Sequence, residues 1–148
     1  YIRRNGVPEK PGLHEFLSWL KEHSIKVAVA TSTTRRVAED YWKQSGIDQY
    51  IDASVCGDEV INSKPDPEIF LKAASLLKVP IAACIVAEDS INGLKAARAA
   101  GAISCMIPDL TPYTKELFPF CDYVSPSLLA CKEILLQTPE ADKLKSWK

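Results

Sequence analysis

Hydrophobic positions along the chain follow two spacings, one typical of amphipathic helices and one typical of buried strands. Behind Pro11, apolar residues between positions 13 and 20 recur every three or four residues, which predicts a helix. The next apolar run, 26–30, is short and uninterrupted, as in a strand that is buried on both faces. The same alternation continues to about residue 136.

The alternation of the two patterns predicts repeated βαβ units. Further strands are expected at 53–56, 84–87, 103–107 and, at a sheet edge, 122–124. A second helix is expected from Thr33 or Thr34 to Gly46, and a third follows the segment 64–67 and reaches Leu77. The last two helices are expected over 91–100, after the N-cap Ser90, and over 127–136, after a loop at 109–119. Strands separated by helices form mostly parallel sheets with helices on both faces. The predicted class is therefore α/β with three layers, as one core over 1–138 and a polar tail over 139–148.

Composition and charge restrict the class of protein further. The 148 residues are 47% hydrophobic and 25% charged, with a net charge of −1, which is typical of one globular domain with a substantial core. This balance leaves no basic field for nucleic acid or an anionic membrane, and no apolar run is long enough to span a bilayer. Residues 1–5 lack the apolar stretch of a signal peptide, so we expect a cytoplasmic protein.

The cysteines and histidines predict no metal site. The five cysteines are odd in number, form no Cys-x-x-Cys pair and mostly lie within apolar runs, so we expect buried, reduced thiols. His14 and His23 are nine residues apart, which is not a spacing typical of metal ligands.

Polar residues near the ends of the predicted strands are the candidates for chemistry, because ligands of open parallel sheets bind beyond the carboxyl ends of the strands. Residues 31–34 offer hydroxyls and backbone N–H groups ahead of a helix, Lys64 lies in a segment stiffened by two prolines, and Glu88 and Asp89 follow a buried strand. Alone, each candidate has an ordinary structural explanation. Residues 31–34 would cap a helix, Lys64 would be a solvated surface lysine, and Asp89 or Ser90 would cap the next helix while Glu88 has no role. The acid pair also suits Mg²⁺, which prefers carboxylate oxygens.

Together these residues resemble the haloacid dehalogenase-like hydrolases, and most closely their β-phosphoglucomutase-like branch of phosphatases and phosphomutases. The resemblance is carried by VAVATS at 27–32, KPDPEIF at 64–70 and VAEDSINGLKAA at 86–97, and it covers about residues 6–125. It implies a Rossmann-like core that acts on a small phosphorylated metabolite, such as a sugar phosphate, with Mg²⁺ and through an aspartyl-phosphate intermediate.

The resemblance implies a phosphate-binding role for three residues. Thr31, through its hydroxyl, and Ser32, through its backbone N–H, would hold the transferring phosphoryl group. Lys64 would neutralise the phosphate and the attacking carboxylate, because charge stabilisation and positioning dominate phosphoryl transfer. Thr31 and Lys64 are therefore the catalytic candidates within this chain.

The resemblance assigns metal and substrate roles to four more residues. Asp89 would be a direct Mg²⁺ ligand and Glu88 a direct or water-mediated one. Thr33 and Arg35 would lie where relatives of this branch contact the remainder of the substrate. Metal-free dehalogenase chemistry, which the wider superfamily also includes, is less consistent with the acid pair.

The family's first motif has no counterpart in this sequence. In the family it is a strand that ends in Asp-x-Asp, with the nucleophile first, whereas no two of the nine aspartates here lie two residues apart. The chain thus resembles a member without this strand, which belongs between the strands 26–30 and 84–87, and without its cap. We expect a missing N-terminal segment or another chain to complete the sheet, and the chain alone to be inactive.

The sequence leaves two alternatives to an enzyme of this branch. A non-catalytic relative, which binds phosphate or a protein partner, would also lack the nucleophile. A nucleotide-binding domain with a parallel sheet is less consistent with the sequence, because no Gly-x-Gly-x-x-Gly follows a strand.

Overall fold

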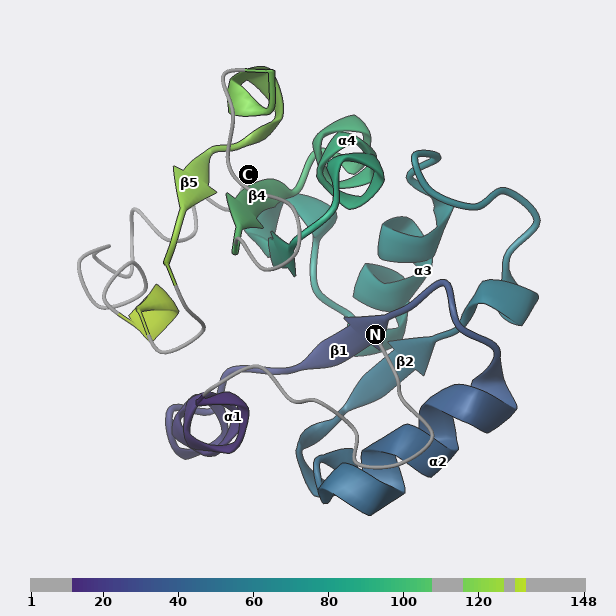
Figure 1. Cartoon of the computed structure of the whole chain (residues 1–148), viewed down its shortest axis with the longest axis vertical. Helices are drawn as coiled ribbons and strands as arrows, with labels where there is room; N and C mark the ends of the chain where they lie inside the picture. The colour runs from purple at the N-terminus through teal and green to yellow at the C-terminus, as the bar shows by residue number, and fades with distance from the viewer. Residues whose placement is uncertain (1–11, 108–115, 127–129, 133–148) are drawn as a thin grey trace.

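The computed structural model describes residues 12–107, 116–126 and 130–132. Its helices are α1 (Leu13–Glu22), α2 (Arg35–Ser45), α3 (Glu68–Leu77) and α4 (Ile91–Ala100), and its strands are β1 (Ala28–Ala30), β2 (Ala53–Val55), β3 (Ile85–Glu88), β4 (Ile103–Met106) and β5 (Tyr123–Val124). Strands and helices alternate along the chain (Figure 1), which confirms the predicted α/β class. None of the described helices is long and apolar enough to cross a bilayer.

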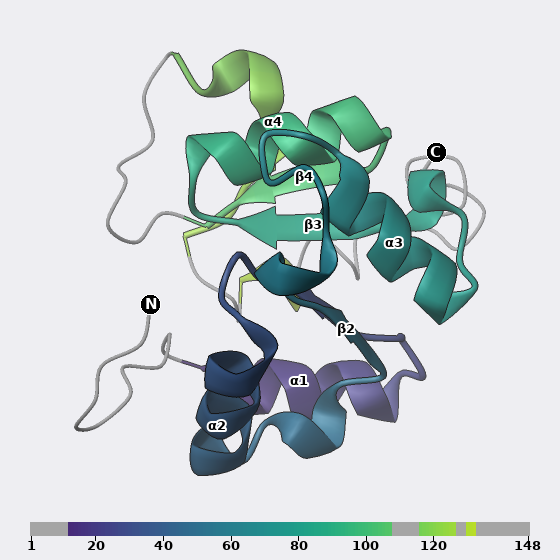
Figure 2. The ribbon, with the colours of Figure 1, turned by 90° about the vertical axis from the view of Figure 1, so that its right-hand side faces the viewer.

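The strands form two parallel sheets. β1 pairs with β2, and β4 lies between β3 and β5, with every pair parallel as predicted. Among the described strands, no backbone pairing joins β1 to β3, and the two sheets lie in different halves of the molecule (Figure 2). The interruption falls between the two strands that the family pattern places on either side of the strand with the nucleophile.

Several element bounds differ from the sequence prediction. β1 begins at Ala28 rather than at residue 26, and β3 continues to Glu88, whose carbonyl oxygen accepts the Ile107 N–H at 3.0 Å. The polar tail 139–148, and most of the predicted loop 109–119 and last helix 127–136, lie outside the described residues. All five cysteines are free thiols, and three of them are buried.

Local hydrogen bonds explain where the helices begin and end. Ser90 caps α4 as predicted, because its hydroxyl accepts the backbone N–H three residues ahead at 3.1 Å. Gly101 ends α4 with a φ of 88°, a conformation that glycine adopts most easily. Thr34 precedes α2 but makes no side-chain capping bond; instead, the first N–H of α2 donates to Asp58 Oδ1 at 3.0 Å. A residue far along the chain thus replaces the cap that the local sequence predicts.

Helix α3 joins the two halves of the molecule. It packs on β1 and β2 and also on α4, which covers the other sheet (Figure 1). Ile69 and Phe70 of α3 share one core cluster with Val55 of β2 and with Ala96 and Ala97 of α4. The alanine face of α4 lets the two helices approach closely. The hydrophobic core therefore continues from one half of the molecule to the other through α3 and α4.

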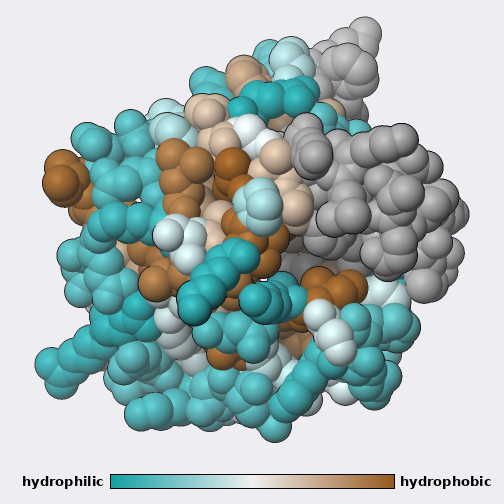
Figure 3. Space-filling view, turned by 180° about the vertical axis from the view of Figure 1, so that it is seen from behind, coloured by the Kyte–Doolittle hydropathy of each residue, from teal (hydrophilic) through white to brown (hydrophobic). Residues whose placement is uncertain are grey.

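A cavity of about 630 Å³ occupies the interval between the two sheets. Side chains of β1 and β3 line it from opposite sides, residues of α1 and α3 also contribute, and Glu88 lies among the lining residues. Apolar side chains also gather at the surface, in the middle of the face that Figure 3 shows, between polar side chains. The interval between β1 and β3 is thus an apolar space with a carboxylate at one end.

We expect substitutions on α3 to separate its buried face from its exposed face. Ile69 is 1% exposed in the cluster that joins the halves, so Ile69→Ala should lower the free energy of unfolding by about 2–5 kcal/mol. Leu76→Ala, on the same helix at 60% exposure, should change it by less than about 0.5 kcal/mol. Urea denaturation of both variants measures the difference, and equal effects would mean that α3 does not join the halves.

Candidate active site

The candidate residues converge where β1 and β3 end. Thr31 and Ser32 follow β1, Glu88 is the last residue of β3, and Lys64 lies just ahead of α3. Because α3 packs on β1, the segment that leads into α3 places Lys64 at this end of the sheets. The spacing of the motifs along the chain therefore becomes proximity in the fold.

Lys64 connects the two half-sheets. Its ammonium donates to Glu88 Oε2 at 3.1 Å and to the Ala30 carbonyl oxygen at 3.2 Å. It also lies 5.0 Å from the centre of the Phe70 ring. The Lys64 and Glu88 side chains are only 11% and 13% exposed, so this ion pair is largely shielded from water. The alternative interpretation of Lys64 as a solvated surface lysine is therefore wrong.

The Glu88 carboxylate is held from several directions. Besides Lys64 on Oε2, its Oε1 accepts the Asp89 N–H at 3.2 Å and the Ser90 hydroxyl at 3.1 Å. A Cβ atom at Gly93 would overlap the Glu88 side chain, so glycine at this position allows the carboxylate to keep its observed orientation beside α4. Sequence reasoning gave Gly93 no role, although its position three residues after Ser90 in the family motif was a signal. Glu88 is thus an oriented member of the site.

The segment after β1 is folded back on itself. The Thr33 N–H donates to Thr31 Oγ1 at 3.1 Å, so Thr33 acts on the threonine hydroxyl through its backbone. The Thr31 N–H continues the β1–β2 pairing by donating to the Val55 carbonyl oxygen at 3.0 Å. Thr31 therefore extends β1, directly beside the Ala30 carbonyl that Lys64 contacts.

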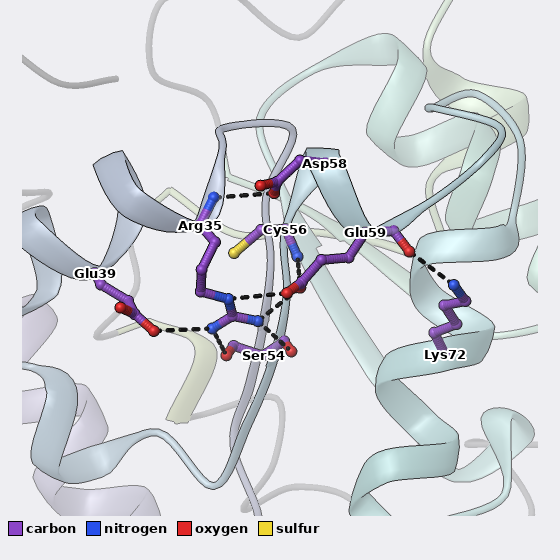
Figure 4. Close-up of polar contacts among 7 residues, drawn as sticks. All are labelled: Arg35, Glu39, Ser54, Cys56, Asp58, Glu59 and Lys72. Carbon is purple, nitrogen blue, oxygen red and sulfur yellow. Dashed lines mark hydrogen bonds and ion pairs between the residues drawn. The ribbon is translucent and has the colours of Figure 1, made fainter.

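The structure does not bring Arg35 into this cluster. Its guanidinium donates to both Glu59 carboxylate oxygens, at 2.6 and 3.0 Å, and to the hydroxyl and carbonyl oxygens of Ser54 (Figure 4). The backbone N–H and carbonyl groups of Ala53 and Val55 point toward β1. Because successive residues of a strand direct these groups to opposite edges, the Ser54 carbonyl lies on the outer edge of β2. Arg35 therefore covers an exposed sheet edge, a role that its position after β1 did not reveal.

The metal-binding capacity of the site consists of oxygen donors. Glu88 and Asp89 are adjacent carboxylates, and in the described part of the chain no group of three histidine, cysteine, aspartate or glutamate side chains is placed to hold a metal ion. Mg²⁺ fits such a donor set, because it is commonly held by one or two carboxylates with water and phosphate oxygens completing its shell. Both Glu88 oxygens already accept hydrogen bonds from the protein, which favours contact of Glu88 with a metal ion through water.

Comparisons with known proteins place the chain in a family. The family model of the haloacid dehalogenase-like hydrolases matches residues 2–101, and the chain belongs to this family. Its relatives and structural neighbours confirm the predicted phosphatase and phosphomutase branch.

Three of the matches illustrate the similarity. The phosphorylated carbohydrates phosphatase of Thermotoga maritima is 43% identical over 95 residues, which are 64% of this chain and 44% of that protein. Protein CbbY of Rhodobacter capsulatus is 36% identical, over 81% of this chain and 54% of its own length. The crystal structure of a putative β-phosphoglucomutase from Thermotoga maritima has a TM-score of 0.79 and 32% identity, over 87% of this chain and 61% of that one. The chain thus spans about half the length of these curated relatives.

The Arg35–Glu59 clamp predicts a pH dependence of stability. The Arg35 guanidinium, together with the Cys56 N–H, lowers the pKa of Glu59 below its ordinary 4.5. A carboxylate whose pKa is lower in the folded than in the unfolded state stabilises the fold above its unfolded pKa, and this stabilisation disappears as the pH falls through the folded pKa. Glu59→Gln should therefore lower the free energy of unfolding at pH 7, and its effect should disappear as the pH falls through the lowered pKa of Glu59.

Chemical denaturation at several pH values measures this difference. In an Arg35→Ala background, the pH dependence of the Glu59→Gln effect should shrink, because the largest cause of the lowered pKa is then absent. An unchanged pH dependence in that background would contradict the clamp.

Proposed function

We propose that this chain forms the phosphate- and metal-binding part of a Mg²⁺-dependent phosphatase or phosphomutase that acts on a small phosphorylated sugar through an aspartyl-phosphate intermediate. The observation that carries the proposal is Lys64, a largely shielded ammonium held between the end of β1 and the Glu88 carboxylate. A cation oriented at the carboxyl ends of parallel strands suits a phosphoryl group in transfer.

Lys64 would stabilise negative charge on the phosphoryl group. Its contacts to the Ala30 carbonyl and Glu88 keep the ammonium in place before the substrate arrives, so little reorganisation is needed during the reaction. The Thr31 hydroxyl already accepts the Thr33 N–H, which leaves its own proton for a phosphate oxygen. The Ser32 backbone N–H would be a second donor to the same group.

Asp89 would hold Mg²⁺ directly and Glu88 would do so through water, since both Glu88 oxygens accept bonds from the protein. When bound, Mg²⁺ would supply positive charge that offsets the repulsion between the carboxylates and the phosphate. Glu88 thereby serves two neighbours at once: it orients Lys64 and contributes negative charge on the side of the metal.

The nucleophile would come from a strand in the interval between β1 and β3, supplied by sequence outside these 148 residues or by another chain. Two observations support this position for the strand: β1 and β3 are not paired with each other, and an apolar cavity lies between them. The first aspartate of that strand would attack phosphorus while the bond from phosphorus to the sugar oxygen breaks, and the second aspartate would protonate that oxygen. Water, in a phosphatase, or a sugar hydroxyl, in a mutase, would then accept the phosphoryl group from the aspartate.

A phosphorylated sugar as substrate is supported by one relative, the phosphorylated carbohydrates phosphatase of Thermotoga maritima. The second candidate function is a non-catalytic relative that binds phosphate or a protein partner. Both candidate functions are compatible with the absence of an Asp-x-Asp pair from these 148 residues. A strand with the nucleophile that inserts between β1 and β3 and restores turnover would decide for the enzyme.

The proposed place of the nucleophile strand can be tested by activity and by stability. The 148 residues alone should release no phosphate from sugar phosphates with Mg²⁺, and their unfolding should be broad, because unpaired buried backbone groups cost about 1–3 kcal/mol each. A form of the protein that also carries the Asp-x-Asp strand should turn over sugar phosphates and unfold in one sharp transition. Phosphate release and thermal melting measure both; if the strand changes neither, its proposed place is wrong.

The proposed role of Lys64 can be tested by substitution. In the strand-bearing form, Lys64→Met should lower kcat by about 10²–10³-fold, comparable to the loss of one charge-stabilising donor in other enzymes. It should also lower the free energy of unfolding, because the largely shielded Glu88 loses its partner. Lys72→Met, which removes an exposed lysine of α3, is the matched control and should retain turnover. Full activity per folded molecule of Lys64→Met would contradict the role.

A further inference from the structure

The segment 31–35 is docked on the segment that follows β2. The Gly57 N–H donates to the Thr33 carbonyl oxygen at 2.9 Å, and Asp58 Oδ1 accepts the Arg35 N–H at 3.0 Å. These contacts come after the Thr31–Val55 bond that ends the pairing of β1 with β2. The proposed phosphate-binding segment therefore rests on the turn that begins at Gly57.

Gly57 is the point of closest approach between the two segments. A Cβ atom at this position would overlap the Ser32 carbonyl oxygen and lie 2.7 Å from the Ser32 carbonyl carbon, closer than Cβ atoms come to other atoms. Both are backbone atoms, so no side-chain rotation can relieve the contact. Its φ lies outside the left-handed range that Gly46 and Gly101 occupy. The structure thus needs the missing side chain of Gly57 and not its conformational freedom.

The contact with Gly57 fixes the orientation of one peptide group. The Ser32 carbonyl and the Thr33 N–H belong to the same planar, trans peptide, so they point in opposite directions. While the carbonyl faces Gly57, the N–H faces Thr31 and donates to its hydroxyl oxygen at 3.1 Å. A side chain at Gly57 would tilt this peptide and weaken the bond that orients the Thr31 hydroxyl.

We propose that Gly57 is a positioning residue for phosphate binding, which acts through the Ser32–Thr33 peptide on the Thr31 hydroxyl. This inference rests on the proposed function, in which Thr31 donates to the phosphoryl group. Gly57 itself lies behind the segment that would contact the substrate. Its effect is transmitted by the backbone.

The test uses inorganic phosphate as the probe and the strand-bearing form of the protein. Gly57→Ala should weaken phosphate binding by about tenfold or more, equivalent to about 1.4 kcal/mol. Gly101→Ala is the matched control: it places a side chain at φ 88° and lowers stability, but nothing lies within 4 Å of the added Cβ atom. It should therefore bind phosphate like the parent protein in titration calorimetry.

A double-mutant cycle separates positioning from general damage. In a Thr31→Val background, which lacks the hydroxyl, Gly57→Ala should weaken phosphate binding little further, because both changes remove the same interaction. Additive losses would overturn the inference, and so would unchanged binding in Gly57→Ala. If the parent protein binds phosphate and the variants give either of these two results, the inference about Gly57 fails but the proposed function stands. If the parent protein binds no phosphate, the inference and the proposed function both fail.

Amide hydrogen exchange provides a test that needs no variant. The inference requires a persistent bond from the Thr33 N–H to the Thr31 hydroxyl, so the Thr33 amide should exchange slowly in the parent protein. Fast exchange at Thr33, with slow exchange at the neighbouring Thr31 amide in the β1–β2 pairing, would overturn the inference even if Gly57→Ala fails to fold.

Discussion

The ion pair between Lys64 and Glu88 is the interaction on which the site depends, because it joins two sheets that share no backbone pairing. Its ammonium also reaches the Ala30 carbonyl, whose oxygen lies on the edge of β1 that faces the interval between the sheets. A largely shielded pair loses solvation as well as gaining attraction, so its net contribution to stability is small. What it supplies is a fixed position for charge.

That position depends in turn on α3 and α4. Lys64 and Ile69 belong to one short stretch, so the helix that closes the core over both sheets also places the ammonium at their carboxyl ends. On the other side, glycine at residue 93 lets α4 pass beside Glu88 while the carboxylate keeps its observed orientation. Core packing and charge placement are therefore consequences of the same two helices, which explains how the site stays assembled around an open interval.

The sequence predicted those parts of the structure that local patterns determine. The apolar runs located the strands, and Ser90 and Gly101 gave the ends of α4, because capping bonds connect residues that are close along the chain. The interruption between β1 and β3 falls where the sequence pattern predicted the Asp-x-Asp strand of the family. Thr34 shows the limit of such patterns: it occupies the N-cap of α2, but the capping oxygen comes from Asp58.

The same limit explains Arg35 and Gly57. Both segments that follow the strands of the first sheet carry polar residues, and nothing local distinguishes an arginine that meets substrate from one that covers the Ser54 carbonyl on a sheet edge. Edge strands need such protection, so a basic residue near a site has two competing uses. Gly57 is the complementary case, since its importance lies in a contact with Ser32 that only the pairing of β1 with β2 creates. Residues that bear charge are visible in a sequence, whereas the backbone that aims them becomes visible only when the chain is folded.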